Sequence, residues 1–265
     1  MTVLIKIKID KYLIPVLIIN MQKNAYSIIS LPTQLGCPVA CDFCISKENK
    51  FLGNLTAEQM VYIINEAKKH ITNDKFVISF TGEGEAYLNS KNIQQVIDYF
   101  SKENDVLFFR ICTSGIKINS LNSIQSNEKP LHLQFSMHSP FDIQRKRLIP
   151  KTKLLTDIIK SIEEVENSFK EIAINYVLIK NFNDREEDFN EILKLIPKKW
   201  IIKLNPLIEN SKNELKKSIY IDKWYEELLK QGYNVKKFIK IGSTLQNSYE
   251  DKMTYELDKI KLKKD

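Results

Sequence analysis

Three cysteines stand close together in the first fifth of the chain, and their spacing indicates metal chemistry. Cys37, Cys41 and Cys44 follow a C-x3-C-x2-C pattern, with Phe43 directly before the last thiol. Thiolates are the ligands of iron–sulfur clusters, and a complete [4Fe–4S] cube takes four of them. Three thiolates would leave one iron open, and an open position marks a catalytic metal centre rather than a structural one. The pattern predicts a [4Fe–4S] cluster that can bind a small molecule.

Three other uses of these thiols stay open from the residues alone. A structural zinc site needs four ligands, usually in two pairs. The other candidates are Cys112, His70, His132 and His138, which form no second C-x2-C or H-x3-H pair. A disulfide would leave one of the three cysteines unpaired, and no secretory signal is expected before them. Buried, inert thiols are the third alternative.

Length and composition predict one well-packed domain, because the chain has 265 residues of which 43% are hydrophobic. The apolar run Tyr12–Met21 is too short to span a bilayer and contains Pro15. Since no cleavage-site pattern follows it, we expect a cytoplasmic protein, which suits an oxygen-labile cluster. A net charge of +7 would attract nucleic acid. Lysine is abundant throughout the chain, however, so charge alone identifies no substrate.

Short β-branched runs alternate with longer amphipathic runs through most of the chain. Strands are expected at 3–9, 13–19, 26–30, 76–80, 106–112, 131–136, 171–179, 200–204 and 235–241, and helices at 56–71, 93–101, near 118, 154–169, 187–195 and 221–231. Such alternation implies a parallel sheet with right-handed crossovers. We predict an α/β fold, a partial (β/α)6 barrel. Residues 1–24 would form a short N-terminal β extension, 25–250 the core domain and 251–265 a basic C-terminal tail.

Small polar groups follow several of these strands, where β/α barrels carry their chemistry. Thr81-Gly82-Glu83-Gly84-Glu85 follows the second barrel strand, and glycine there lets backbone groups approach a ligand closely. The third, fourth and sixth strands are followed by Cys112-Thr113-Ser114-Gly115, Ser136-Met137-His138-Ser139 and Asn205-Pro206. Each segment alone is more simply a loop, and His138 a structural histidine. Their recurrence at strand ends predicts a ligand site.

The cysteine spacing, with Phe43 before Cys44, resembles that of the radical S-adenosylmethionine (SAM) superfamily. The resemblance implies a partial barrel of the radical SAM type, with a [4Fe–4S] cluster on Cys37, Cys41 and Cys44 and SAM on its open iron. An electron donor such as flavodoxin or ferredoxin would drive cleavage of SAM to methionine and a 5′-deoxyadenosyl radical, which abstracts hydrogen from a substrate. The cofactor carries this chemistry, and the protein orients it.

Between about residues 26 and 210 the chain is similar to the RlmN/Cfr branch, whose members methylate adenosine in RNA. The similarity rests on Gln34–Cys37, Phe51–Glu58, Gly84-Glu85 with Asn89, Thr113–Gly115, Ser136–His138, Arg145–Pro150 and Asn205-Pro206. By position it implies SAM contacts at Gly84, Glu85, Cys112, Ser136, Met137, His138 and Asn205. That branch has serine where this chain has Cys112, and a thiol is the weaker hydrogen-bonding group.

Two cysteines that methylation in that branch requires are missing from the matching positions. Ser30 stands seven residues before Cys37, and the segment Ile241–Gln246 holds no cysteine. Serine is too basic and too poor a leaving group to carry and release the methyl group. Cys112 would lie at the wall of the SAM pocket. With 36 residues before Cys37, we also expect the N-terminal RNA-binding extension of these enzymes to be absent.

The leading hypothesis is therefore a radical SAM enzyme that uses its radical directly for hydrogen abstraction from a nucleotide, nucleoside or modified base. One alternative is RNA methylation with a relocated or partner-supplied cysteine. Another is a non-enzymatic cluster-bearing sensor or nucleic-acid-binding module. The basic segment Arg145-Lys146-Arg147, with Lys151 and Lys153, is expected to be a solvated loop. Its alternative use is to hold phosphate or RNA at the barrel mouth.

Overall fold

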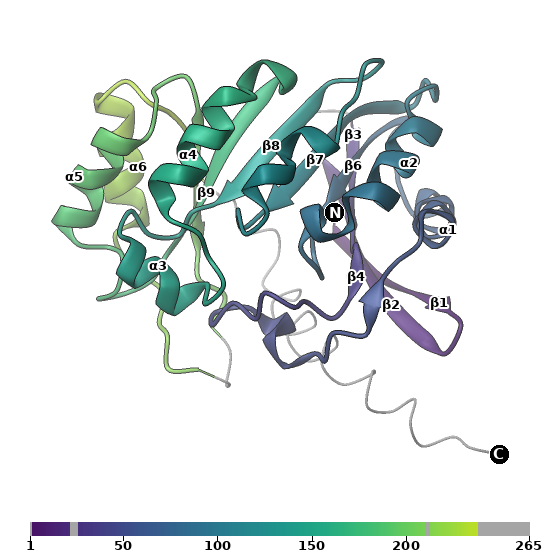
Figure 1. The fold of residues 1–265 in the computed structure, drawn as a ribbon, viewed down its shortest axis with the longest axis horizontal. Helices are drawn as coiled ribbons and strands as arrows, with labels where there is room; N and C mark the ends of the chain where they lie inside the picture. The colour runs from purple at the N-terminus through teal and green to yellow at the C-terminus, as the bar shows by residue number, and fades with distance from the viewer. Residues whose placement is uncertain (1, 22–25, 210–212, 238–265) are drawn as a thin grey trace.

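The computed structural model describes residues 2–21, 26–209 and 213–237 (Figure 1). The strands of its main sheet are β1 (Thr2–Ile9), β2 (Tyr12–Met21), β3 (Tyr26–Leu31), β6 (Lys75–Phe80), β7 (Val106–Thr113), β8 (Leu131–Ser136), β9 (Glu171–Leu178), β10 (Ile201–Pro206) and β11 (Asn234–Lys237). The α-helices are α1 (Ala57–Lys68), α2 (Ser90–Phe100), α3 (Asp142–Leu148), α4 (Leu155–Glu164), α5 (Glu186–Leu195) and α6 (Ile221–Lys230). Shorter elements are the strands β4 (Gln34–Leu35) and β5 (Gly53–Asn54) and the 3-10 helices η1 (Ile45–Glu48), η2 (Ala86–Asn89), η3 (Ile118–Ser123) and η4 (Glu166–Ser168).

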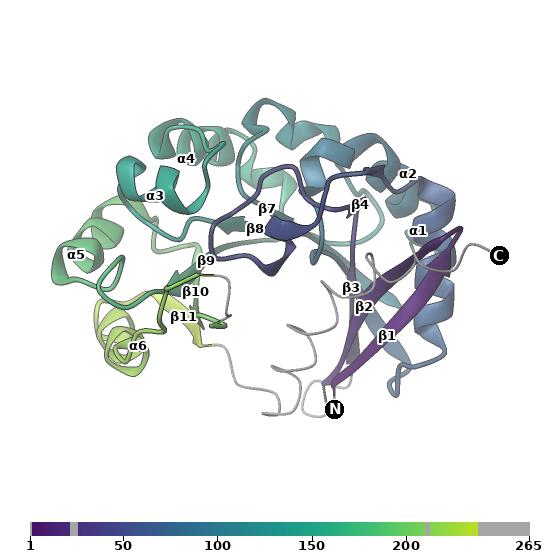
Figure 2. The ribbon, with the colours of Figure 1, turned by 90° about the horizontal axis from the view of Figure 1, so that it is seen from below.

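The sheet has the order β1-β2-β3-β6-β7-β8-β9-β10-β11, so each strand lies beside the strand of this sheet that precedes it in the chain. From β3 onward the neighbours are parallel. β1 and β2 extend the sheet as an antiparallel pair. Figure 2 shows the sheet as an open arc with helices along its convex side. The predicted α/β fold, a partial barrel with an N-terminal β extension, is confirmed.

Local sequence explains how the helices form on that convex side. α1 begins at a capping box, in which Thr56 accepts a hydrogen bond from the Gln59 backbone N–H and the Gln59 side chain accepts from the Thr56 N–H. The buried residues of α1 are Met60, Ile63, Ile64 and Ala67, which recur at helical spacing. This apolar stripe is what attaches the helix to the sheet.

Alternation along the strands separates two faces of the sheet. On β7, Phe109 and Ile111 lie in the apolar core beneath the helices. Arg110 and Cys112 therefore point to the opposite, concave side, because successive side chains alternate. The same alternation holds on β8 and β10. We call this concave surface the inner face; on these three strands it carries Arg110, Cys112, Gln134, Ser136, Lys203 and Asn205.

A second, smaller apolar cluster lies at the carboxyl ends of the strands. Its buried members are Val39, Leu148, Ile149, Ile179 and Leu207. Cys37, Cys41 and Phe43 of the cysteine loop pack against it. This cluster therefore covers the base of the loop that carries the three thiols.

Two parts of the chain differ from the sequence expectation or lie beyond what is described. Residues 142–148 form the helix α3, where a loop was expected. The final strand is described only to Lys237. The cysteine-free segment 241–246 and the basic tail 251–265 lie outside the described residues. Within the described ranges, no helix has the length and apolar character needed to cross a membrane.

Candidate active site at the carboxyl ends of the strands

The three cysteines lie on the loop between β4 and β5, at the carboxyl edge of the parallel sheet. On one side, the Asn49 side chain donates to the buried carboxylate of Glu83, in the loop after β6. On the other side, the Asp42 N–H donates to the carbonyl oxygen of Leu148 at 2.8 Å. The loop is thus held between two neighbouring segments of the barrel mouth.

The thiols form a donor set that fits an iron–sulfur cluster. All three are free and half-buried. Burial raises the pKa of Cys37 to about 11 and that of Cys41 well above its usual value, and the neighbouring Cys44 and Cys37 raise the pKa of Cys41 further. The thiols are therefore near enough to interact. No three Cys, His, Asp or Glu side chains of the described ranges converge as ligands of a single ion would, whereas cluster thiolates each bind a different iron.

His138 links the cysteine loop to the sheet. Its ring meets that of Phe43 edge-on, with 4.8 Å between the ring centroids. Its Nδ1 accepts a hydrogen bond from the Val177 N–H at 3.1 Å, and its carbonyl oxygen accepts from the Asn183 side chain at 2.6 Å. Burial lowers the pKa of His138 to about 3, so the ring is neutral near pH 7. These contacts give it a structural role; its contact with SAM stays a prediction.

The loop after β6 closely approaches Thr33 and Gln34, which lead into the cysteine loop, at Gly84. Its φ is +109°, and a Cβ at this position would lie 2.6 Å from Oγ1 of Thr33, so only glycine fits. The next residue, Glu85, is buried. Its carboxylate accepts from the Thr113 hydroxyl at 2.6 Å and from the N–H and hydroxyl of Ser114 at 2.8 and 2.7 Å. Glu85 thus ties the loop after β6 to the end of β7.

The other residues predicted to contact SAM come to the same edge of the sheet. Cys112, Ser136 and Asn205 lie on the inner face near the carboxyl ends of β7, β8 and β10. The Asn205 side chain donates to the Lys203 carbonyl oxygen at 3.0 Å. Met137 is fully buried and packs in the main apolar core, so its contact with SAM stays a prediction. The structure therefore gathers the predicted residues at one site.

The prediction of a basic loop at residues 145–147 is wrong, because Arg145 is fully buried on α3. Its Nε donates to the Met137 carbonyl oxygen at 3.0 Å, and its Nη2 donates to those of Ser114 and Ser136 at 2.5 and 3.2 Å. The guanidinium lies 5.0 Å from the Phe135 ring centroid. Burial lowers the pKa of Arg145 to about 10, so it stays cationic near pH 7. Arg145 therefore clamps the ends of β7 and β8.

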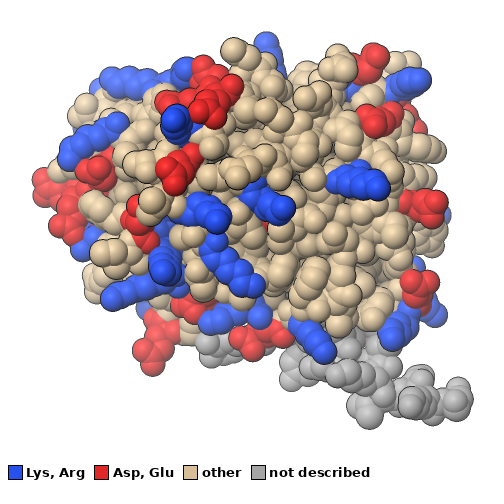
Figure 3. All heavy atoms as spheres, viewed as in Figure 1, with Lys and Arg blue, Asp and Glu red and all other residues tan. Residues whose placement is uncertain are grey.

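Of the other basic residues near α3, one forms a hydrogen bond to the cysteine loop and others are exposed to solvent. Lys151 donates to the Pro38 carbonyl oxygen of the cysteine loop, whereas Lys146 and Arg147 are exposed. Figure 3 shows Lys and Arg scattered over the face seen in Figure 1, including its lower half, with acidic groups mixed among them. A phosphate-binding role for this segment would therefore rest on its exposed lysines and Arg147, without Arg145.

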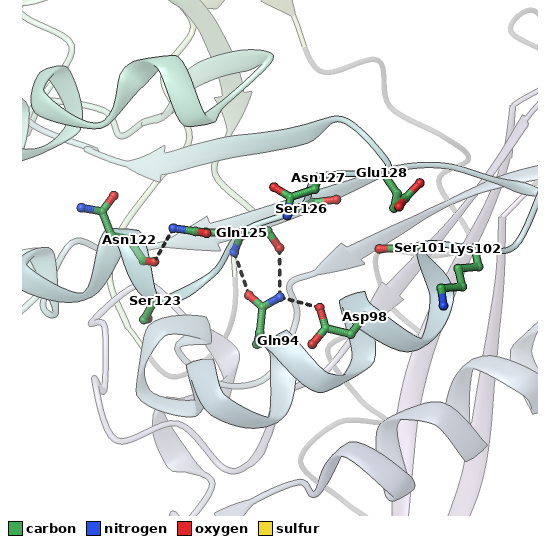
Figure 4. A pocket seen from close by; sticks show the side chains of 10 residues that line it. All are labelled: Gln94, Asp98, Ser101, Lys102, Asn122, Ser123, Gln125, Ser126, Asn127 and Glu128. Carbon is green, nitrogen blue, oxygen red and sulfur yellow. Dashed lines mark hydrogen bonds between the residues drawn. The ribbon is translucent and has the colours of Figure 1, made fainter.

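A polar hollow lies at the opposite end of the barrel from the cysteines. Figure 4 shows it between α2 and the segment that precedes β8. Its side chains largely bond one another: Gln94 donates to Asp98 at 2.8 Å and to the Gln125 carbonyl oxygen at 3.1 Å. It contains no cysteine and none of the predicted SAM contacts. We therefore place the candidate active site at the carboxyl edge of the sheet, beside the cysteine loop, and not in this hollow.

Two curated relatives share sequence with most of the chain. One, from Petrotoga mobilis, is named probable dual-specificity RNA methyltransferase RlmN; it is 26% identical over 257 residues, which are 94% of this chain and 73% of that protein. A protein of the same name from Chlorobium phaeobacteroides is 30% identical over 192 residues, or 68% of this chain and 52% of the relative. The chain thus spans from about half to three quarters of the length of these relatives.

Solved structures with a similar fold include a radical SAM methyltransferase from Sphaerobacter thermophilus. Its TM-score is 0.75 at 18% identity, over 91% of this chain and 78% of that one. Streptococcus suis SuiB, solved with bound SAM, has a TM-score of 0.58 at 16% identity, over 87% of this chain and 55% of its own. At these identities, the likeness is one of fold alone.

The family profile of the Radical SAM superfamily matches residues 31–196. That span is more than half of the chain, and it includes the three cysteines, the Gly84–Glu85 loop and the strand ends of β7 and β8. By sequence and by fold, the chain belongs to the radical SAM superfamily.

Proposed function

We propose that this enzyme binds a [4Fe–4S] cluster through Cys37, Cys41 and Cys44, binds SAM beside it, and abstracts hydrogen directly from a substrate. When bound and reduced, the cluster and SAM supply a 5′-deoxyadenosyl radical. The observation that carries the proposal is the junction of the cysteine loop with the loop after β6. There, Asn49 donates to Glu83, and the Glu85 N–H donates to the Gln34 side chain at 2.8 Å.

The chain's own residues would position and shield these groups. Gly84 brings backbone close to Thr33 and Gln34 before the cysteine loop, and Glu85 fixes the end of β7 through Thr113 and Ser114. Ser136 and Asn205 offer a hydroxyl and an amide on the inner face for polar groups of SAM. The apolar cluster around Val39 limits the access of water to the thiols.

The positions that would carry methyl-transfer cysteines support direct hydrogen abstraction. Ser30 lies on β3, where its Cα pairs with those of Leu17 and Ser79. A hydroxyl there cannot take the place of a thiol in methyl transfer. A nucleotide, nucleoside or modified base is the proposed substrate, by analogy with relatives named as RNA methyltransferases.

Anaerobic reconstitution with iron and sulfide tests the proposal. With SAM and dithionite, we expect the protein to form 5′-deoxyadenosine, measured by liquid chromatography. Cys41→Ala should abolish this product, because one cluster ligand is lost. Cys112→Ser is the matched control and should retain it, since Cys112 lies outside the cysteine loop and the related branch carries serine at this position. Equal yields from the Cys41→Ala variant and the unaltered protein would overturn the proposal.

RNA methylation is a second candidate, which the names of the relatives favour. It would need a cysteine other than those of the cluster, and Cys112 on the inner face of β7 is the one that the described residues offer. Mass spectrometry of RNA incubated with the reconstituted enzyme decides between the candidates. Methyladenosine that disappears in Cys112→Ala would favour methylation; its absence alongside 5′-deoxyadenosine would favour direct abstraction.

A further inference from the structure

A layer of charged and amide side chains lies on the inner face, deeper than the predicted SAM contacts. Its members are Arg110, Gln134 and Lys203, on β7, β8 and β10. Each stands two residues before a predicted SAM contact, namely Cys112, Ser136 or Asn205. Side chains two residues apart on a strand share a face, and two residues span about 6–7 Å. This deep layer is therefore separate from the SAM contacts but next to them.

The deep layer is held together by the Gln134 amide. When its oxygen faces the two cations, that oxygen accepts from Nε of Arg110 at 3.1 Å and from Nζ of Lys203. The Lys203 side chain is 16% exposed, so it lies largely out of water. Two cations thus converge on one neutral amide inside the arc. A neutral amide oxygen satisfies hydrogen bonds but supplies no counter-charge to either cation.

One neighbouring carboxylate balances this positive charge only in part. Glu171 lies 3.4 Å from Lys203, but the same carboxylate also lies 3.2 Å from Lys236. In the part of the chain that the structure describes, no carboxylate stands within 4.0 Å of Arg110. Burial lowers the pKa of His132, beside Glu171, to about 4, so its ring is neutral near pH 7.

Holding this excess of positive charge partly out of water, on the inner face, costs free energy of folding. Burial and the nearby Arg110 lower the pKa of Lys203 to about 8. Charges removed from water are retained in proteins chiefly where a counter-charge meets them. Apolar side chains of similar size would pack against the sheet without this cost. The deep layer therefore has the character of a binding site for an anion.

We propose that Arg110, Lys203 and Gln134 bind the anionic group, a carboxylate or phosphate, of a small substrate inside the barrel. The assignment deepens the proposed function and rests on it. Guanidinium and ammonium groups are suited to oxyanions, and Arg can bind one through two parallel hydrogen bonds. An anion bound here leaves the rest of a small substrate directed toward the strand ends, where the cluster and SAM are proposed to bind.

Binding of simple anions tests the site without any turnover. Phosphate and acetate serve as probes of the two oxyanion classes, and chloride at matched ionic strength serves as the reference. In the reconstituted protein with SAM, at least one probe should raise the melting temperature above the chloride reference. Arg110→Gln and Lys203→Gln should each lose that rise. The matched control Lys146→Gln, on the exposed face of α3, should keep it.

A nucleotide comparison extends the test to a larger ligand of the proposed class. If phosphate is the favoured probe, adenosine monophosphate should bind at least about tenfold more tightly than adenosine, a difference of roughly 1.4 kcal/mol. That preference should vanish in Arg110→Gln. Anion responses that are the same in all variants would overturn the assignment.

The two proposals fail in different ways. Lys146→Gln, on the exposed face of α3, should leave SAM affinity and uncoupled formation of 5′-deoxyadenosine unchanged. If Arg110→Gln loses SAM binding itself, the cations serve SAM and the anion-site proposal is wrong. If the unaltered protein forms no 5′-deoxyadenosine while the anion responses follow the expected pattern, the proposed function fails and the anion site stands.

Discussion

Two buried charges of opposite sign meet at one residue of the active-site edge. The N–H and hydroxyl of Ser114 donate to the Glu85 carboxylate, and its carbonyl oxygen accepts from the Arg145 guanidinium. The end of β7 is thereby fixed from the β6 side and from α3 together. Hydrogen bonds to charged groups are stronger than neutral ones and stronger still out of water. At the scale of single residues, these three hydrogen bonds of Ser114 join the loop after β6, the end of β7 and α3.

Removing the Arg145 side chain should destabilise the fold. Arg145→Met removes a buried donor from the carbonyl oxygens of Ser114, Ser136 and Met137, of which Met137 keeps the Ser139 N–H. We expect the free energy of unfolding to fall by about 2–4 kcal/mol, measured by urea denaturation. Arg147→Met, two residues away and exposed, is the control and should change it by no more than about 0.5 kcal/mol. Similar values for both variants would contradict the clamp.

Comparing alanine variants at Gly84 and Gly82 should distinguish the effect of steric crowding from that of backbone strain. Gly84→Ala must place Cβ against Thr33, whereas Gly82→Ala, at a similar φ of +98°, meets only Pro32 at 3.8 Å. Both variants carry a strain of about 1–3 kcal/mol, and only Gly84→Ala adds the clash. We therefore expect Gly84→Ala to lower the melting temperature more and to weaken SAM binding in calorimetry. Equal losses in both variants would show that close approach at Gly84 is unimportant.

At the scale of elements, each of β7, β8 and β10 presents two levels of chemistry on its inner face. The level near the carboxyl end holds the predicted SAM contacts Cys112, Ser136 and Asn205, and the deeper level holds the proposed anion site. The outward residues of the same strands are apolar and bury against the helices. On each strand, the outward side chains thus pack in the core and the inward side chains line the proposed site. The alternation of side chains along the strand separates the two sets.

Acid should weaken the sheet through His132 on β8. The His132 ring stacks on Phe108, with 4.1 Å between ring centroids, and burial lowers its pKa to about 4. In the unfolded chain, histidine titrates near 6.5. Between pH 6.5 and 4 the unfolded chain therefore binds more protons. The contribution of His132 to stability is complete above about pH 6.5 and decreases as pH falls toward 4.

Urea denaturation at pH 7 and at pH 5 measures this dependence. One proton accounts for a slope of at most about 1.4 kcal/mol per pH unit. His132→Phe, which preserves the aromatic stack, should reduce the loss of stability between the two pH values. His70→Phe changes an exposed histidine and serves as the control. A pH dependence unaltered by His132→Phe would exclude this residue as its source.

At the scale of the whole molecule, sequence patterns predicted the arc of alternating strands and helices well. The strand at residues 131–136 has the predicted bounds, and most others differ by one or two residues. α3 was missed because it is short and its Arg-Lys-Arg run is typical of a solvated segment. Arg145 is buried there by hydrogen bonds to strands distant in sequence, which no local pattern encodes.

Sequence motifs predicted only some residues of the candidate site. Motifs at strand ends located the predicted SAM contacts, since parallel strands bring their carboxyl ends to one edge. Alternation also shows that Arg110 shares a face with Cys112, and Lys203 with Asn205. It does not show which face is concave, because both faces of a parallel sheet are ordinarily covered. Only the curvature of the assembled sheet places these two cations opposite one another.

The order of the strands also bears on how the enzyme is made. Because every strand of the sheet lies beside its predecessor, each can add to an edge that already exists while the ribosome is still extending the chain. The cysteine loop and the loop after β6 are synthesised early. β10, which brings Lys203 and Asn205, is among the last strands to dock. In a nascent chain, the thiol loop would thus form before the proposed anion site, which is complete only once β10 has docked.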